Sequence, residues 1–103
     1  MILRLQYKEY GSGPMGYPYS EDETFWEKEC SRSNLEEVKR ELYDYVRKEF
    51  SIDWFEDSLE EKSEKSYTLN HLQCQVVFMG NVIDSWDLPR EEFIFNRELV
   101  EIL

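Results

Sequence analysis

The sequence has few of the residues and segments that mark membrane proteins, secreted proteins or metalloenzymes. Its 103 residues include one histidine, two cysteines, four glycines and three prolines. No run of about 18 or more apolar residues occurs, so no transmembrane helix is expected. The first ten residues lack a charged start followed by a long apolar core. We therefore expect no signal peptide and a cytoplasmic location, in the host cell if the chain is phage-encoded.

The few chemically reactive residues form no recognisable site. Cys30 and Cys74 lie far apart, without a CxxC motif or a neighbouring histidine, so we interpret both as reduced, buried thiols. A disulfide between them stays an open alternative. His71 is interpreted as a structural or surface residue, because no serine or cysteine stands in a nucleophile motif. We expect no catalytic residue, no metal site and no cofactor, and we predict that the chain is not an enzyme.

Two short motifs match functional signatures but lack the context that those signatures need. Residues 11–16 spell GxGxxG after a predicted strand, but a dinucleotide site requires a helix at the third glycine, and a Tyr-Pro-Tyr sequence follows instead. Residues 60–62, with Asp53 or Asp57 upstream, match the D…ExK pattern of magnesium nucleases. That chemistry needs rigid adjacent strands, whereas this segment has the composition of a mobile loop. We expect neither motif to act.

The charge balance is strongly acidic. Lysine and arginine number 12 against 23 aspartates and glutamates, which gives a net charge of −11. Aromatic residues make up 16%, too many for a disordered acidic tail, so we expect one folded domain over residues 1–103. Such a charge repels phosphates and anionic membranes and attracts basic proteins. We therefore expect a basic protein partner, with no direct binding to nucleic acid or membrane.

Residues 33–50 have the pattern of one amphipathic helix. Ser33 followed by Glu36 three residues later predicts a capping box that begins the helix. Apolar residues then recur at steps of three and four, which places them on one side. The predicted buried stripe consists of Leu35, Val38, Leu42, Tyr45 and Val46.

Alternation of apolar and polar residues predicts a sheet, and the predicted fold class is α+β. One main helix packs on a small, mostly antiparallel sheet of three to four strands, in the order β-α-β-β-β. The predicted strands are Ile2–Glu9, inside the sheet, and Tyr67–Met79, Val82–Asp87 and Glu92–Phe95.

A two-residue turn at Gly80-Asn81 is expected to join the second and third strands as a hairpin. This turn pairs Met79 with Val82, Phe78 with Ile83 and Gln75 with Trp86. The resulting second face of the hairpin is apolar, and it is either covered by Phe93–Phe95 or serves as a contact surface, for example in a homodimer. Its residues are Val77, Met79, Val82 and Trp86.

Several segments allow more than one interpretation. Residues 11–20 hold three glycines and two prolines and are predicted to be a loop. Residues 20–30 suit either a short helix capped by Ser20 or a strand through Thr24–Cys30. Residues 55–66 suit an exposed loop or a short surface helix, after a turn at residues 52–55 that folds back on the helix end. Residues 97–103 suit a helical turn or an edge strand.

Two acidic segments flank the predicted helix, each with a net charge of −4, and each has aromatic side chains expected to be exposed among its carboxylates, Trp26 in the first and Trp54 and Phe55 in the second. A solvated acidic surface that serves solubility alone is one interpretation. The other is a partner-binding surface, since arginine-rich surfaces bind carboxylates and aromatic rings together. The candidate partner-binding residues are Glu21, Asp22, Glu23, Trp26, Glu27 and Glu29 in the first segment, and Asp53, Trp54, Glu56, Asp57, Glu60, Glu61 and Glu64 in the second.

In size, acidity and mixed α+β pattern, with acidic clusters at Glu21–Glu29 and Asp53–Glu64, the chain resembles small inhibitors made by phages and mobile elements, anti-CRISPR proteins among them. It is also similar to bacterial immunity proteins that act against nuclease toxins. The first resemblance implies an inhibitor that occupies the basic surface of a nucleic-acid-binding protein and mimics DNA there. The second implies an immunity protein or antitoxin for a basic toxin or nuclease. A structural oligomerisation module is a further alternative.

Overall fold

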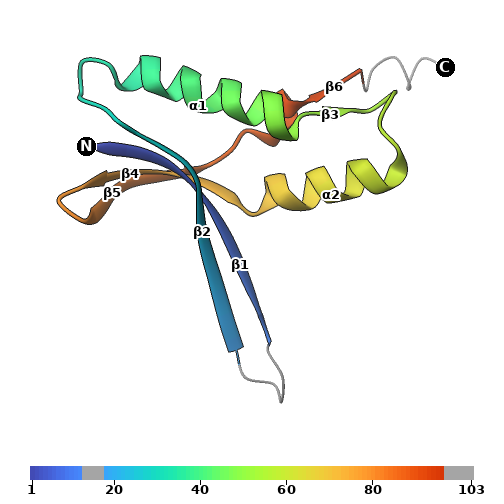
Figure 1. The fold of residues 1–103 in the computed structure, drawn as a ribbon, viewed down its shortest axis with the longest axis horizontal. Coiled ribbons are helices and arrows are strands. Elements are labelled where there is room, and N and C mark those ends of the chain that lie inside the picture. The colour runs from blue at the N-terminus through green and yellow to red at the C-terminus, as the bar shows by residue number, and fades with distance from the viewer. Residues whose placement is uncertain (13–17, 97–103) are drawn as a thin grey trace.

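The computed structural model describes the backbone of residues 1–12 and 18–96 and the side chains of residues 1–9 and 22–96. It is an α+β fold with two helices rather than one main helix, so the predicted class is confirmed and the predicted element order is not (Figure 1). In chain order the elements are β1 (Ile2–Ser12), β2 (Pro18–Glu29), α1 (Leu35–Phe50), β3 (Ile52–Asp53), α2 (Leu59–Asn70), β4 (Leu72–Phe78), β5 (Asn81–Asp87), the 3-10 helix η2 (Arg90–Phe93) and β6 (Ile94–Phe95).

The main sheet has four strands in the order β2-β1-β4-β5, and each neighbouring pair is antiparallel. The first predicted strand therefore does lie inside the sheet, between β2 and β4. β4 pairs only with residues 2–7 of β1, so beyond that point β1 and β2 pair with each other alone. Figure 1 shows this part of the hairpin leaving the helices as an arm.

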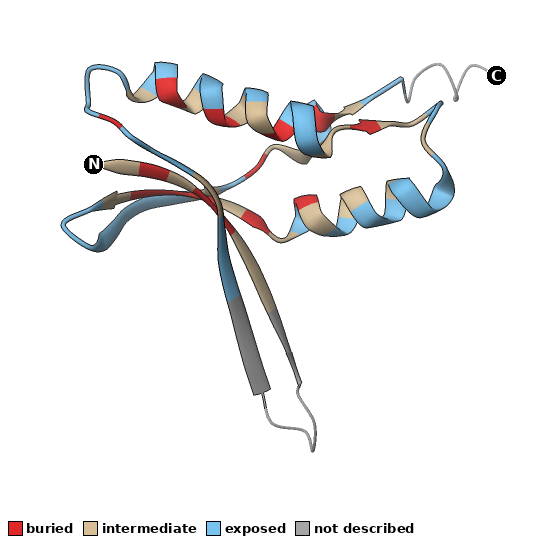
Figure 2. Ribbon diagram, in the orientation of Figure 1, coloured by how far each residue is buried: buried red, intermediate tan, exposed pale blue. Residues whose placement is uncertain are grey.

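The core lies between α1 and one face of β1 and β4. Leu3 stands opposite Val76, and Leu5 opposite Cys74, so these alternate residues share one face of the sheet. Figure 2 shows buried residues on α1 and on the strands beneath it. The stripe expected for α1 is confirmed, since three of its residues are buried and the other two pack against the core. The buried ones are Val38, Leu42 and Val46.

α1 begins at Leu35, two residues later than expected, and the predicted capping box is not formed. The N-cap residue is Asn34, whose side chain does not cap the helix. Its amide oxygen instead accepts from the Ser31 backbone N–H at 2.7 Å, and the Ser33 hydroxyl lies 2.8 Å from that of Ser31. The polar side chains of this turn bond to one another, which leaves none for the helix N–H groups.

For two segments the sequence allowed either a helix or another structure, and the structure decides between these alternatives. Residues 18–29 form strand β2, so the strand interpretation is confirmed and the strand is longer than expected. Residues 59–70 form helix α2, so the surface-helix interpretation is confirmed, again over a longer span. α2 takes in residues 67–70, which were predicted to begin a strand, and β4 starts only at Leu72.

The predicted hairpin turn is wrong by one residue, and the predicted register is wrong by two residues beside the turn, where Phe78 stands opposite Asn81 rather than Ile83. The turn residues are Met79 and Gly80, both with positive φ, rather than Gly80 and Asn81. Positive φ at both central residues is the conformation of a type I′ hairpin turn. A bulge at residue 83 then shifts the ladder, so Trp86 stands opposite Cys74 instead of Gln75. Trp86 therefore lies on the core face, not on the predicted apolar second face.

The last described segment closes the end of the core without joining the main sheet. Only Ile94 and Phe95 of the predicted strand at residues 92–95 are extended, and they pair in parallel with β3. Phe93 and Ile52 are fully buried there. The helical turn or edge strand expected at residues 97–103 lies outside the described residues.

Replacing Leu42 by alanine should test the packing of α1. Leu42 is fully buried between α1 and the sheet, so the substitution should lower the free energy of unfolding by about 2–5 kcal/mol. Leu59→Ala is the control, because Leu59 lies on α2 with 81% of its surface exposed and should change stability by less than about 0.5 kcal/mol. Urea unfolding measures both, and equal losses would contradict this core.

Candidate partner-binding surface

The turn before α2 is built by two of the predicted site residues. The Asp53 carboxylate accepts from the backbone N–H groups of Phe55 and Glu56, each at 3.1 Å, and from the Asn96 side chain at 3.0 Å. These bonds, that of Asn96 first, lower the pKa of Asp53. Asp57 accepts from the Asp53 backbone N–H at 3.0 Å. Both carboxylates therefore hold the turn together and are occupied within the chain.

α2 begins at a side-chain cap. The Ser58 hydroxyl accepts from the Glu61 backbone N–H at 3.1 Å, which satisfies one of the free donors of the first turn. From this start, Glu60 and Glu61 each lie one helical turn from Glu64, so the three share one side of α2. We call these three residues, together with Glu56 in the preceding turn, the α2 acidic face. All four are exposed.

The two lysines of α2 do not neutralise this face. Lys65 lies 2.9 Å from Asp57, and the Lys62 ammonium lies over the Trp54 ring, 4.9 Å from its centroid. Both lysines are half-buried, whereas the glutamates point to solvent. None of the four glutamates takes part in an ion pair within the described part of the chain. α2 thus separates its charges, with cations inward and carboxylates outward.

Exposed apolar side chains accompany the α2 acidic face. Phe55 keeps 53% of its surface exposed, and Leu59 is exposed to a greater extent. Tyr67, farther along α2, is half-exposed. The sequence pattern predicted exposed aromatics here, and Phe55 agrees with it. Leu59 was not predicted as part of the surface. Its place directly after Ser58, at the start of a polar helix, is the sequence feature that could have indicated it.

β2 carries a second row of carboxylates at the edge of the sheet. Asp22, Glu27 and Glu29 stand opposite Lys8, Arg4 and Ile2 of β1, and all three carboxylates are exposed. Two of the cations nearby are engaged elsewhere, whereas Lys8 stands beside Asp22. The Lys28 ammonium lies 2.8 Å from both carboxylate oxygens of Glu41 on α1, and Arg4 donates to the Gln75 side chain at 2.7 Å. This β2 acidic edge therefore also keeps its negative charge.

The structure does not bring all the predicted site residues together. Figure 1 shows β2 and α2 on different parts of the molecule, so the two acidic segments form separate surfaces. Trp26 and Trp54 are half-buried against the core, so they are not the exposed rings that were expected. Glu23 is exposed on β2, beside Tyr7 in the register, and the Glu21 side chain lies outside the described residues.

A cluster of tyrosine, histidine and glutamate ties the hairpin arm to α2. The Glu9 carboxylate accepts from the Tyr67 hydroxyl at 2.7 Å and from the Tyr7 hydroxyl at 2.9 Å. These two bonds lower the pKa of Glu9, so the carboxylate is ionised at neutral pH. His71 stacks on Tyr67 with centroids 4.3 Å apart and caps the C-terminal end of α2, rather than lying on a strand. The contacts agree with the structural role expected for His71.

The face of the main sheet that points away from α1 is polar, although an apolar second face had been predicted there. Gln75 is almost fully buried; it accepts from Arg4 and donates to the Gln73 side chain at 2.9 Å. Gln6 accepts from Thr24 at 2.7 Å on the same face. Among the described side chains of this face, apolar residues occur only near the hairpin turn. The predicted contact surface is therefore reduced to the end of the hairpin.

Within residues 1–9 and 22–96, no three histidine, cysteine, aspartate or glutamate side chains are placed to hold a metal ion. Neither α1 nor α2 is long and apolar enough to cross a membrane. Comparison with protein-family models, with curated proteins and with solved structures found no match. Any statement about function therefore rests on the residues of this chain.

The thiols provide a test of the core face. Cys30 and Cys74 are both buried and unpaired with each other, and burial raises the pKa of the Cys74 thiol to about 12. Since the thiolate is the reactive form, Cys74 in a Cys30→Ser variant should react with a disulfide reagent on the order of a hundredfold more slowly in the native than in the urea-unfolded chain. Equal rates, followed by absorbance, would show that Cys74 is not in the core.

The Asp57 carboxylate should make stability depend on pH. The bond to Lys65, and then the bond to the Asp53 backbone, lower the pKa of Asp57 in the native chain. The carboxylate therefore contributes its full stabilisation above the unfolded-state pKa of about 3.9. This stabilisation is lost as the pH falls through the native pKa. Asp57→Asn should therefore lower the melting temperature at neutral pH, and the difference from the parent should shrink at about pH 3. Glu60→Gln, on the exposed side of α2, is the control. A difference independent of pH would contradict this role.

Proposed function

We propose that this chain is a binding protein without catalytic chemistry, which inhibits a nucleic-acid-binding protein by occupying its basic surface, as anti-CRISPR and other anti-defence proteins do. The proposal places it in the cytoplasm of the cell in which its target acts. The observation that carries the proposal is the separation of charge on α2. Lys62 and Lys65 are held inward by Trp54 and Asp57, and no cation among the described residues forms an ion pair with the α2 acidic face.

The surroundings of that face favour a protein partner over solvation alone. A surface that serves only solubility gains nothing from large apolar side chains among its charges, yet Phe55 and Leu59 are exposed next to Glu56 and Glu60. Lys and Arg side chains of a partner can bind the carboxylates while their stems, or neighbouring apolar groups, cover Phe55 and Leu59. Carboxylates in this arrangement take the places that phosphates would occupy on a basic surface.

The β2 acidic edge supports the same proposal from a second side of the molecule. There the Lys28 ammonium is bound by Glu41, and Arg4 by Gln75, so that neither cation forms an ion pair with Glu27 or Glu29 among the described residues. A partner with one compact basic site would contact α2 or β2 but not both, because the two surfaces are separate. We assign the main contact to α2, since only there do exposed apolar side chains accompany the acids.

Affinity capture from a lysate of the organism encoding the chain should retain a nucleic-acid-binding protein that salt and competing double-stranded DNA both release. For the purified partner, Glu60→Gln/Glu64→Gln should weaken binding by about threefold to tenfold, the worth of two exposed charge contacts. The matched control is Glu37→Gln/Glu49→Gln, which removes two exposed charges from α1 and should leave binding within about twofold. Titration calorimetry or surface plasmon resonance gives the constants.

Two results would contradict the proposal, and two others would contradict the assignment of the contact to α2. Binding that does not respond to ionic strength would exclude a charge-based contact. Retention of a partner with no nucleic-acid site, unaffected by added DNA, would exclude occupation of such a site. Equal weakening by the α2 pair and the α1 pair would show that only net charge matters. Weakening by Glu27→Gln/Glu29→Gln alone would move the contact to β2.

A further inference from the structure

The two edges of the main sheet differ in how they are protected. β2 forms one edge and carries charged side chains along most of its described length, which discourages pairing with another strand. β5 forms the other edge, and its residues 81–85 are all exposed. Two consecutive apolar residues, Val82 and Ile83, stand there with 47% and 55% of their surfaces exposed. β5 is therefore an edge strand with exposed apolar side chains, and its Ser85 backbone N–H donates to the Asp84 carboxylate at 2.9 Å.

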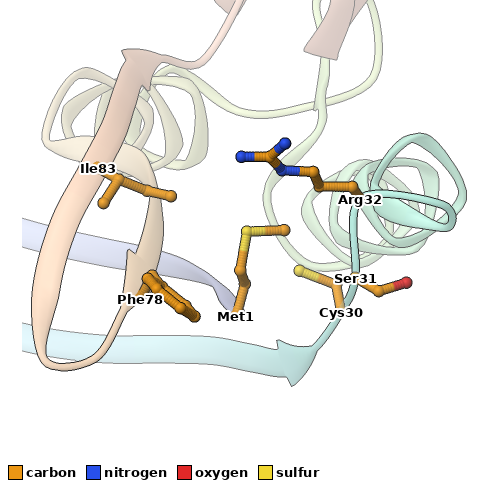
Figure 3. Close-up of a pocket in the computed structure, with 6 residues that line it drawn as sticks. All are labelled: Met1, Cys30, Ser31, Arg32, Phe78 and Ile83. Carbon is orange, nitrogen blue, oxygen red and sulfur yellow. The ribbon is translucent and has the colours of Figure 1, made fainter.

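An apolar hollow adjoins this edge. It has a volume of about 320 Å³, and Figure 3 shows Ile83 and Phe78 of the hairpin on one side of it, Cys30 and Arg32 on the other, and Met1 between them. Arg32 supplies the only charged side chain among the lining residues. The hollow is large enough for one or two aliphatic side chains. It borders Ile83, which a strand added beside β5 would contact.

Charge decides which kind of strand fits. β5 carries Asp84 and Asp87 and no cation, and neither aspartate forms an ion pair with the described residues. A second copy of this chain would bring the same aspartates, and a further net charge of −11, against them. An added strand that carries lysine or arginine would meet Asp84 and Asp87 with the opposite charge.

We propose that an extended segment of the basic partner adds to the sheet as a strand beside β5, with apolar side chains at the tip hollow (Met1, Cys30, Ser31, Arg32, Phe78 and Ile83) and basic side chains beside Asp84 and Asp87. This inference rests on the proposed function, because it names the form in which the partner binds. Backbone hydrogen bonds to β5 supply affinity, and the hollow and the two aspartates supply selectivity.

A synthetic nine-residue peptide of lysine and valine is a defined probe, with two lysines three residues apart to meet Asp84 and Asp87 and a valine beside one of them to meet Ile83. Added to the full chain, it should slow amide hydrogen exchange within Asn81–Asp87 by about tenfold and shift the NMR signals of those amides. The same peptide methylated on every backbone nitrogen keeps its charges and side chains but has no N–H donors, so it should give no protection. Exchange in β2 should be unaffected by either peptide.

A matched pair of variants separates the edge from general charge. Ile83→Glu and Leu59→Glu each replace an exposed apolar side chain by a carboxylate, the first at the hollow and the second on α2. Protection of β5 by the peptide should be lost in Ile83→Glu and retained in Leu59→Glu. NMR spectra of the free variants verify that both are folded.

Three results would overturn the inference. Equal effects of the methylated and unmethylated peptides would mean attraction by charge alone, and no change at β5 with millimolar peptide would mean that the edge does not accept a strand. Protection of β5 without peptide, rising with protein concentration, would assign the edge to a second copy. None of these results alters salt-sensitive capture of a partner through α2. Failure of the proposed function would instead be seen as partner binding that the Glu60→Gln/Glu64→Gln substitutions do not weaken.

Discussion

The rest of the structure depends on the burial of one face of β1 and β4 beneath α1. β1 is the strand through which β2 and β4 are joined, and its Leu3 and Leu5 are fully buried between neighbours and helix. Burial of each such side chain stabilises the fold by about 1.5–3 kcal/mol, which is large against the net stability of a domain of this size. The hairpin arm, α2 and β5 all attach to this layer, and none has a comparable apolar face of its own.

The same packing determines where the cations lie. Lys28 shares the α1 side of the sheet with Leu3, so its nearest carboxylate is Glu41 on the helix rather than Glu27 or Glu29 on its own strand. On α2 the core contact is made by Leu69 at the C-terminal end, and the lysines follow the inner side of the helix. Strong net charge alone does not produce the α2 acidic face or the β2 acidic edge, because the lysines in both segments could have paired with these carboxylates.

The sequence predicted the class, the central strand and the buried stripe of α1, because these depend on apolar periodicity over many residues. Helix starts were less certain, since they depend on single hydrogen bonds. Ser33 and Ser58 both stand three residues before a glutamate, but only Ser58 accepts from the helix N–H. The Ser33 hydroxyl bonds to Ser31, a competing local contact that no three-residue spacing can reveal. The second helix was predicted only as an alternative, because the hydrogen bond that begins it could not be predicted from the spacing of two residues.

Bulges limited the prediction of which side chains share a face, and they matter most for the candidate site. Strict alternation would put Asp22, five residues from Glu27, on the opposite face of β2. The irregularity between Leu5 and Gln6 inserts one residue into β2, so that Asp22 stands opposite Lys8 while Glu27 stands opposite Arg4, both on the face away from α1. One inserted residue thus gathers Asp22, Glu27 and Glu29 on a single face, whereas Glu23, opposite Tyr7, lies on the other face. The bulge in β5 does the reverse for the predicted contact surface, since it turns Trp86 toward the core and leaves only the end of the hairpin apolar and open.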